Sequence, residues 1–487
     1  ANDGFRKHNS WNGTTLSGEI TTPLSPTSSL KWMLSNNFTK MEDPGPLTPD
    51  SIQSDRLAAN PFFLSDVKKE NRMNSRVHYS NNFSEKLQLR GSIYYNQRDA
   101  DNIQTYLTGI IFWPADTKER LIENRIFGIE AQGTLEQTIE YIDNKFVFGG
   151  ELEIGNLRST YFDYDVTDKM RGDWKSNGEG KRTHIGFYVH DEVPIIPTVK
   201  LNAGFRFDNF NDAYDVVSAE PSYSAFSPKI GINYLFHTEI ENDVPVYTGN
   251  TYLNIARSFK APTLDQLFDQ RFPEMLSPSN PKLLPQNSWN FEIGVYQRGR
   301  IIERKMYGEL LTSLYSNSVQ DEIDFDVTSF KYTNLSQTIH NGFEAGFKLH
   351  WIPNISAFVN YTFTSVTFKG GLNDGKKLKV VPTSTFAFGG TYKYQNVAGT
   401  ITLNTYGGRY LDDNNIYYLQ GSTEMNVRIS YKRRNLRGYI DMDNILNTKF
   451  NQWGYTLGNQ EYLYPHAPSS IRIGIEASID TPWNSQE

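Results

Sequence analysis

Residues 199–208 read VKLNAGFRFD, a strict alternation of apolar and polar side chains. Successive side chains of a β-strand point to opposite faces, so this pattern places Val199, Leu201, Ala203, Phe205 and Phe207 together on one face. A helix would instead need an apolar repeat of about 3.6 residues, which the stretch lacks. The stretch therefore predicts a strand with one apolar face and one polar face.

The same alternation recurs along the whole chain, in about 19 runs. The runs reach about nine to eleven residues, the length of a tilted strand that crosses a bilayer, whereas strands of soluble sandwiches average about five or six. The predicted strands are residues 14–22, 30–40, 70–80, 86–98, 126–136, 145–156, 182–193, 199–210, 225–236, 249–259, 287–298, 302–315, 341–351, 356–366, 383–394, 398–406, 422–432, 437–446 and 469–479.

The connections between these runs alternate between short and long. Short connections such as residues 194–198 and 433–437 indicate tight turns on the periplasmic side. Long connections indicate extracellular loops, and they are residues 41–69, 99–125, 157–181, 260–286, 316–340 and 447–468. The pattern predicts an all-β fold, a transmembrane antiparallel up-and-down β-barrel with long extracellular loops and short periplasmic turns.

The polarity of the strands adds a further expectation. If the long loops are extracellular, the first and the last strand both run toward the periplasm. A closed bacterial barrel normally has an even number of strands with both ends in the periplasm. We therefore expect an odd number of strands to precede Ala1, so that residues 1–487 form an N-terminally truncated barrel domain.

Composition excludes several other classes of protein. A mean hydropathy of −0.55 and the lack of any apolar run of about 20 residues exclude a helical membrane protein. The net charge of −7, with Lys and Arg dispersed along the chain, argues against a nucleic-acid partner. The chain has no Cys, which removes disulfides and thiolate metal sites. A soluble β-protein that binds carbohydrate stays open as the alternative outside the membrane class.

Catalytic motifs are missing, so we expect no enzyme and no catalytic residue. His184 and His190 lie six residues apart on one strand, about 20 Å from each other, and cannot share a metal ion. We interpret them as residues of the barrel wall, and we expect neither a metal site nor a cofactor.

Several short motifs resemble one known family, and their order extends over about 200 residues. Residues 258–264, SFKAPTL, resemble a "FRAP" segment that contains Phe259 and Pro262, and Asn280-Pro281-Lys282-Leu283 resembles the "NPxL" segment that follows it. Further matches are residues 288–294, residues 341–344 with Gly342 and Glu344, and residues 443–450 with Asn444. Together they resemble the barrel of TonB-dependent outer-membrane receptors of the ferric-siderophore type.

The resemblance implies a barrel of about 22 strands, so that about three strands and the plug domain would precede Ala1. It implies active import of a ferric siderophore or similar metal chelate, energised by TonB acting through the plug, in the outer membrane of a Gram-negative bacterium. The implied partners are TonB, an Fe(III)-siderophore ligand, outer-membrane lipid and lipopolysaccharide, and the implied state is a monomer. Two alternatives stay open, namely a receptor for cobalamin or another large nutrient and a passive porin.

Ligand capture is expected in the long loops and the upper lumen. Planar aromatic rings and fixed cations suit a flat anionic chelate. The candidate ligand-binding residues are Arg271, Phe272, Arg409, Tyr410, Trp453 and Tyr455. The resemblance disfavours haem, because residues 263–279 lack the His that haem receptors place there. Phe259, Pro262, Asn280, Pro281, Gly342, Glu344 and Asn444 are interpreted as structural.

Overall fold

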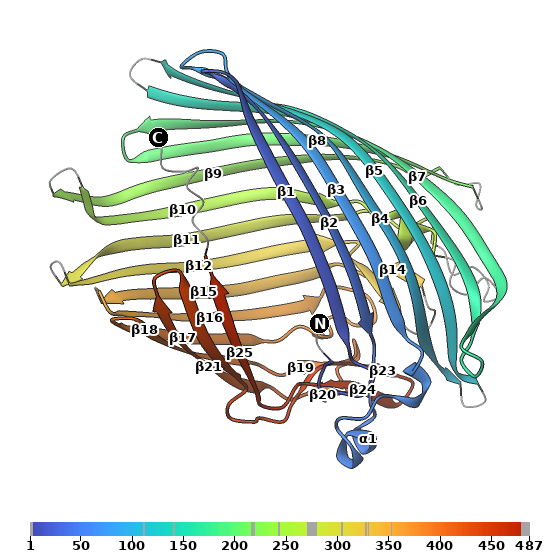
Figure 1. Ribbon diagram of the computed structural model, residues 1–487. Helices are drawn as coiled ribbons and strands as arrows, with labels where there is room; N and C mark the ends of the chain where they lie inside the picture. The colour runs from blue at the N-terminus through green and yellow to red at the C-terminus, as the bar shows by residue number, and fades with distance from the viewer. Residues whose placement is uncertain are drawn as a thin grey trace.

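The computed structural model is built around one antiparallel sheet of 19 strands (Figure 1). It describes residues 3–110, 113–139, 142–215, 220–241, 244–269, 280–302, 305–326, 329, 331–351 and 353–478. In the order of pairing, the strands are β1 (Trp11–Ser25), β2 (Ser28–Glu42), β3 (Val67–Asn82), β4 (Leu87–Ile110), β5 (Trp113–Ile139), β6 (Ile142–Asp165), β7 (Met170–Ile196), β8 (Val199–Tyr214), β9 (Ser222–Glu241), β10 (Val244–Lys260), β11 (Gln286–Ile302), β12 (Met306–Gln320), β15 (Thr338–Trp351), β16 (Ile355–Phe368), β17 (Ser384–Tyr394), β18 (Val397–Tyr406), β21 (Ser422–Arg433), β22 (Leu436–Asp443) and β25 (Ser470–Ala477).

Each strand of this sheet corresponds to one of the runs predicted from alternation, so the fold class and the strand order are confirmed. The lengths differ in one region. Strands β4 to β7 contain 24 to 27 residues, about twice the expected length. The prediction that residues 99–125 and 157–181 form loops was therefore wrong for most of those residues. Many of their side chains are polar or charged, and strand pairing satisfies the backbone hydrogen bonds whichever side chains the strands carry.

The apolar face of the sheet is its outer face. Ile93, Phe127, Ile154 and Phe187 lie on four neighbouring strands, and between 42% and 51% of each residue's surface is exposed. A band of this size would be unfavourable in water, but a bilayer covers it with acyl chains. Within the described residues, no helix is both long and apolar enough to cross a membrane.

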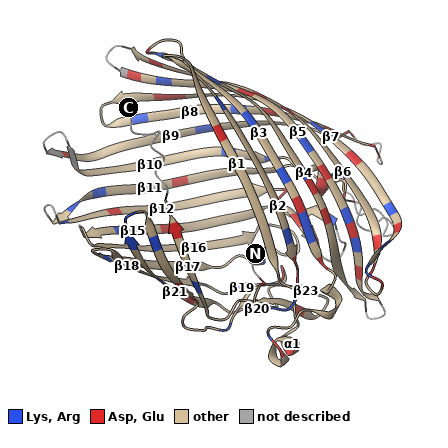
Figure 2. Cartoon of the chain, viewed as in Figure 1, with Lys and Arg blue, Asp and Glu red and all other residues tan. Residues whose placement is uncertain are grey.

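The polar face lines the concave side of the wall. Arg76 on β3 reaches Glu130 on β5 at 2.5 Å, and the Tyr94 hydroxyl on β4 donates to Glu153 on β6 at 3.0 Å. The two residues of each pair lie on strands separated by one intervening strand, so their backbones are about 10 Å apart. Their side chains bridge this distance because the sheet is curved and side chains on its concave face converge. Figure 2 shows Lys and Arg interleaved with Asp and Glu along β3 to β7. The lumen is therefore lined by positive and negative side chains that pair with one another.

The long connections gather at one end of the wall, here called the loop end, along the right side and the bottom of Figure 1. They contain the small hairpins β13 (Ile323–Asp326) with β14 (Lys331–Asn334), β19 (Arg409–Tyr410) with β20 (Tyr418–Leu419), and β23 (Asn451–Leu457) with β24 (Gln460–Pro465), and the helices α1 (Pro49–Ser54), η1 (Pro61–Phe63) and α2 (Leu264–Leu267). The opposite end, called the turn end, carries the short connections.

Connections from the two ends of the sequence pack against each other at the loop end. Leu47 forms a backbone bridge with Leu463, in which each residue donates to the other at 2.8 Å. Phe63, Leu107 and Leu457 form a buried apolar cluster beside this bridge. The first connection and the last one therefore share one small hydrophobic core.

The outermost strands of the sheet each have one neighbour. Among the described strands, β1 pairs with β2 alone and β25 pairs with β22 alone. Both run from the loop end to the turn end, so they are parallel to each other.

Candidate functional site

A pocket of about 330 Å³ lies at the loop end, where three connections meet β18 and β21. We call it the mouth pocket. Tyr406, Ser422 and Glu424 enter it from the ends of these two strands, on the same face as the polar Asn404 and therefore on the lumenal side. Its lining residues are Val380, Pro382, Tyr406, Arg409, Ser422, Glu424, Phe450, Gln452, Trp453 and His466.

Arg409 supplies the positive charge of the mouth pocket. It lies on β19, whose pairing with β20 orders the loop between β18 and β21. Its Nη2 donates to the backbone carbonyl of Gln452, whereas no acceptor among the described residues lies within hydrogen-bonding distance of its buried Nε. No carboxylate in the described part of the chain forms an ion pair with it, and burial lowers the pKa of the guanidinium. Among the described residues, Arg409 is therefore a partly dehydrated cation with no carboxylate partner.

Aromatic rings form a second side of the pocket. Phe450 stacks on the His466 imidazole with ring centroids 4.2 Å apart. The Trp453 ring lies 5.5 Å from Tyr455 and 5.2 Å from Tyr464, on the paired strands β23 and β24. These contacts fix the plane of the indole while 41% of the residue remains exposed. The pocket thus presents a held ring face to solvent.

The third side of the pocket is polar. His466 Nε2 lies 3.5 Å from a carboxylate oxygen of Glu424, and His466 Nδ1 lies 3.0 Å from the carbonyl of Ala467. The pocket therefore has a cationic end at Arg409 and an acceptor-rich end at Glu424.

The connection between β16 and β17 is held against the pocket by ion pairs. Lys379 contacts Asp324 and lies 2.9 Å from Asp413, so it joins three separate connections. Burial alone would lower the pKa of Lys379, but the two carboxylates raise it above its usual range. The next residue, Val380, has φ +63°, a conformation that costs a β-branched residue free energy, and its N–H donates to the Tyr410 carbonyl at 2.7 Å.

The structure brings together only part of the predicted ligand-binding set. Arg409 and Trp453 line the same pocket. Tyr410 packs against Tyr418 with centroids 5.2 Å apart, and Tyr455 stacks on Tyr462 at 5.6 Å, so both support the pocket walls from behind. Arg271 and Phe272 lie outside the described residues.

Sequence reasoning missed every pocket residue except Arg409 and Trp453, and among those missed are Glu424, Phe450 and His466. Glu424 lies at the polar position of an alternating strand and could have been proposed as lumenal. Phe450 and His466 lie at the two ends of the last connection, and only its folding into β23 and β24 brings them into contact. No local sequence signal marks that contact.

The motif residues before and after α2 occupy structural positions. Phe259 lies on β10 with its ring 5.8 Å from Phe210. Pro262 is fully buried, and its carbonyl accepts from Arg182 at 2.6 Å. Asn280 donates to the Tyr332 carbonyl at 3.0 Å, and Pro281 follows it at the start of a turn. These contacts attach the connection between β10 and β11 to the wall.

The remaining motif residues also lie within the framework. Gly342 on β15 faces the Tyr315 ring, which an added Cβ would meet at 2.2 Å. Glu344 lies two residues further on the same strand, opposite Ser313. Asn444 adopts φ +46°, is 1% exposed, and donates to the carbonyls of Thr448 and Ala467.

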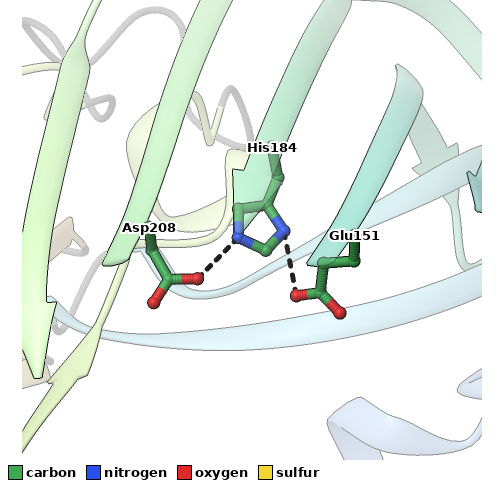
Figure 3. A group of neighbouring side chains, drawn as sticks. All are labelled: Glu151, His184 and Asp208. Carbon is green, nitrogen blue, oxygen red and sulfur yellow. Dashed lines mark hydrogen bonds and ion pairs between the residues drawn. The ribbon is translucent and has the colours of Figure 1, made fainter. Parts of the chain in front are cut away.

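One wall cluster has the composition of a metal site. Glu151, His184 and Asp208 come from β6, β7 and β8, and their ligand atoms lie within 4.8 Å of one another (Figure 3). His184 lies between the carboxylates, with Nε2 2.8 Å from Asp208 and Nδ1 3.6 Å from Glu151. The Arg206 guanidinium contacts both carboxylates, at 2.7 Å from Asp208.

Arg206 therefore already provides a positive charge to both carboxylates. A further contact stabilises the cluster, because the His184 ring stacks on Phe210 at 4.1 Å. His190 forms its own contact, 3.5 Å from Glu192. The two histidines act as wall residues with separate partners.

Comparison with known proteins agrees with this architecture. The family described as "TonB dependent receptor-like, beta-barrel" matches residues 7–445. No curated protein sequence matches the chain.

Several solved structures share the fold, and sequence identities of 13–14% limit the likeness to the fold. The ferric citrate transporter FecA in its unliganded form superposes with TM-score 0.78 at 14% identity, over 97% of this chain and 71% of that one. The ferric-catecholate import receptor Fiu from E. coli K12 gives 0.76 at 14%, over 98% and 76%. The siderophore receptor PiuA from Acinetobacter baumannii gives 0.78 at 13%, over 96% and 74%. The alternating wall, the long connections at one end and the family match together show that this chain belongs to the TonB-dependent receptor β-barrel family.

Proposed function

We propose that this protein imports a ferric siderophore or a similar anionic metal chelate across the outer membrane of a Gram-negative bacterium, energised by TonB. Two features support the proposal. The family consists of receptors and transporters of the outer membrane, and the neighbours in fold include transporters of ferric citrate and of ferric catecholate by their own descriptions.

The observation that carries the proposal is that Arg409, which has no carboxylate partner among the described residues, lines the mouth pocket together with Trp453. The pocket is on the lumenal side of the loop end, which would face the cell exterior if the short turns are periplasmic. A dehydrated cation beside a held indole ring favours an anionic ligand with a flat surface. A pocket at this place would meet the ligand before the lumen does.

We further propose that residues 1–487 form the wall of a receptor whose preceding segment supplies the plug and the strands between β1 and β25. The free edges of these strands support it, because a strand edge in lipid leaves N–H and C=O groups without partners, each at a cost of several kcal/mol. Measured amide exchange along β1 tests it. The β1 amides that do not pair with β2 should be protected in the product of the complete gene and exchange freely in residues 1–487 alone.

Uptake measurements test the import function. Cells grown under iron limitation, with and without the gene, are given radiolabelled iron as citrate, catecholate, hydroxamate or haem complexes, together with radiolabelled cobalamin. The proposal expects saturable, gene-dependent uptake of one ferric complex, and a protonophore should abolish it. Gene-dependent uptake of cobalamin and of no ferric complex would show that the ligand is cobalamin. Uptake that does not saturate and is insensitive to the protonophore would identify a passive pore.

A further inference from the structure

We propose that the mouth pocket binds a planar aryl group that carries ionised oxygens, the chemistry of a catecholate, as one arm of the chelate. This inference rests on the proposed function and adds the class of ligand and the role of each contact.

Arg409 supplies the positive charge that a ligand in the mouth pocket would meet. Three other arginines of the lumenal face each contact a carboxylate, namely Arg182, Arg206 and Arg428. Arg409 has none among the described residues, and its buried Nε has no acceptor there. A guanidinium has five N–H donors, and leaving a buried donor unpaired costs free energy. An anionic oxygen in the pocket would pair with the accessible N–H groups of this guanidinium and supply the counterion that the described residues lack.

The remaining surface of the mouth pocket includes exposed aromatic rings. Trp453 and Tyr406 line the same pocket as Arg409 and keep 41% and 40% of their surfaces exposed, and contacts with Tyr455 and Tyr464 hold the Trp453 ring in place. An aliphatic carboxylate or a hydroxamate could pair with Arg409 but would leave these rings uncovered. An aryl oxyanion both pairs with the cation and covers a ring face, so it uses both features.

Arg409 and Glu424 carry opposite charges, and this difference would orient a ligand in the mouth pocket. Glu424 forms the acceptor-rich end of the pocket, and its interaction with His466 holds a carboxylate oxygen there. A second anionic group would be repelled at that end, whereas a hydroxyl or amide N–H would find an acceptor. The ligand arm should therefore place its ionised oxygens at Arg409 and its donor toward Glu424.

The mouth pocket is small. A volume of about 330 Å³ is near the lower limit for pockets that enclose a whole small molecule, about 300–1,000 Å³. It accommodates one aryl arm, while the metal centre and the other arms would remain in the open mouth. The ion pairs of Lys379 fix the wall at Val380, so the pocket is formed before the ligand arrives.

Calorimetric titration of the receptor, purified in detergent from the complete gene, tests this assignment. The probes are the ferric complexes of 2,3-dihydroxybenzoate, citrate and acetohydroxamate. We expect the dihydroxybenzoate complex to bind most tightly. Arg409→Gln and Trp453→Ala should each weaken it about tenfold or more, and Trp453→Phe should retain most of the affinity.

Matched controls lie at the turn end. Arg298, whose guanidinium lies 4.8 Å from the centre of the Tyr307 ring, and Trp351, which is 49% exposed, have similar chemistry far from the pocket. Arg298→Gln and Trp351→Ala should leave the affinity unchanged. Each variant is also checked for heat-modifiable migration, so that loss of folding is not read as loss of binding.

The outcomes separate the two proposals. Tighter binding of the citrate or acetohydroxamate complex, or catecholate binding that Arg409→Gln leaves intact, overturns the aryl assignment and leaves ferric import standing. Failure of all three complexes to bind, together with no gene-dependent iron uptake, overturns both.

Discussion

At the scale of single residues, a buried carboxyl group at the loop end couples the first connection to the wall. Asp66 is 2% exposed and accepts from the Thr105 backbone N–H at 2.7 Å and from the Thr105 hydroxyl at 2.6 Å. Burial raises the pKa of Asp66 to about 7, although the two Thr105 bonds act in the opposite direction. The folded state thus holds the proton more tightly than the unfolded chain does.

This shift predicts a pH dependence of defined sign. The pKa of Asp66 rises from 3.8 to about 7 on folding, so its contribution to stability is complete below about pH 4 and is lost as the pH rises through 7. The loss is at most about 4 kcal/mol, and local relaxation will reduce it. Amide exchange at Thr105 should accelerate between pH 4 and 7 beyond the intrinsic rate, and Asp66→Asn should remove that excess. Equal pH profiles for both proteins would contradict the prediction.

The residues of the mouth pocket show how far reasoning from single residues extends. Arg409 and Trp453 were predicted because a cation and an indole in long connections are suited to a flat anion. Glu424 and His466 were not predicted, because their meaning depends on a distance of 3.5 Å between residues 42 positions apart (from 424 to 466). The same limit explains Tyr455, whose aromatic character was recognised but whose contact with Tyr462 was not.

At the scale of elements, the connection between β10 and β11 is anchored by its own apolar residues. The capping box of Thr263 and Gln266 starts α2. Leu264, Leu267 and Phe268 then pack with Leu283 in a buried cluster against Leu157 and Tyr214 of the wall. Arg120 on β5 adds an ion pair with Asp265. The described part of this connection is therefore docked on the wall.

A matched pair of truncations tests this docking. Leu267 is fully buried, whereas Leu284 in the same connection is 51% exposed. Leu267→Ala should destabilise the docked state by about 2–5 kcal/mol through lost contacts and a cavity, whereas Leu284→Ala should cost far less. Limited proteolysis of folded receptor should cut the connection faster in Leu267→Ala alone. Equal cutting of both variants would show that the cluster does not anchor the connection.

At the scale of the whole molecule, the outer apolar band and the lumenal polar face set stability in lipid. Ile230 and Asn233 lie three residues apart on β9 and point to opposite faces, with Ile230 50% exposed on the outer side. Ile230→Arg should destabilise the barrel by about 2–4 kcal/mol if it lies near the midplane. Asn233→Arg should cost less, because the lumen contains water. Urea unfolding in lipid vesicles measures both, and equal losses would reverse the assignment of faces.

The sequence alone determined the class of fold, the order of the strands and the face that each side chain takes. These follow from a repeat of two residues, a local property that neighbouring residues decide. The alternation of short and long connections predicted the direction of each strand. The motifs of residues 258–264 and 280–283 pointed to the family that the comparison then showed.

Only the tertiary structure decided how far the strands continue and which residues form the mouth pocket. Strands β4 to β7 extend well past the apolar pattern because paired backbones remain satisfied where alternation no longer matters. The pocket combines connections that are far apart in the chain, and their meeting depends on curvature of the wall and on packing such as that of Leu47 with Leu463. Local patterns carry no record of such contacts, because their free energy arises only when the wall has brought the connections together.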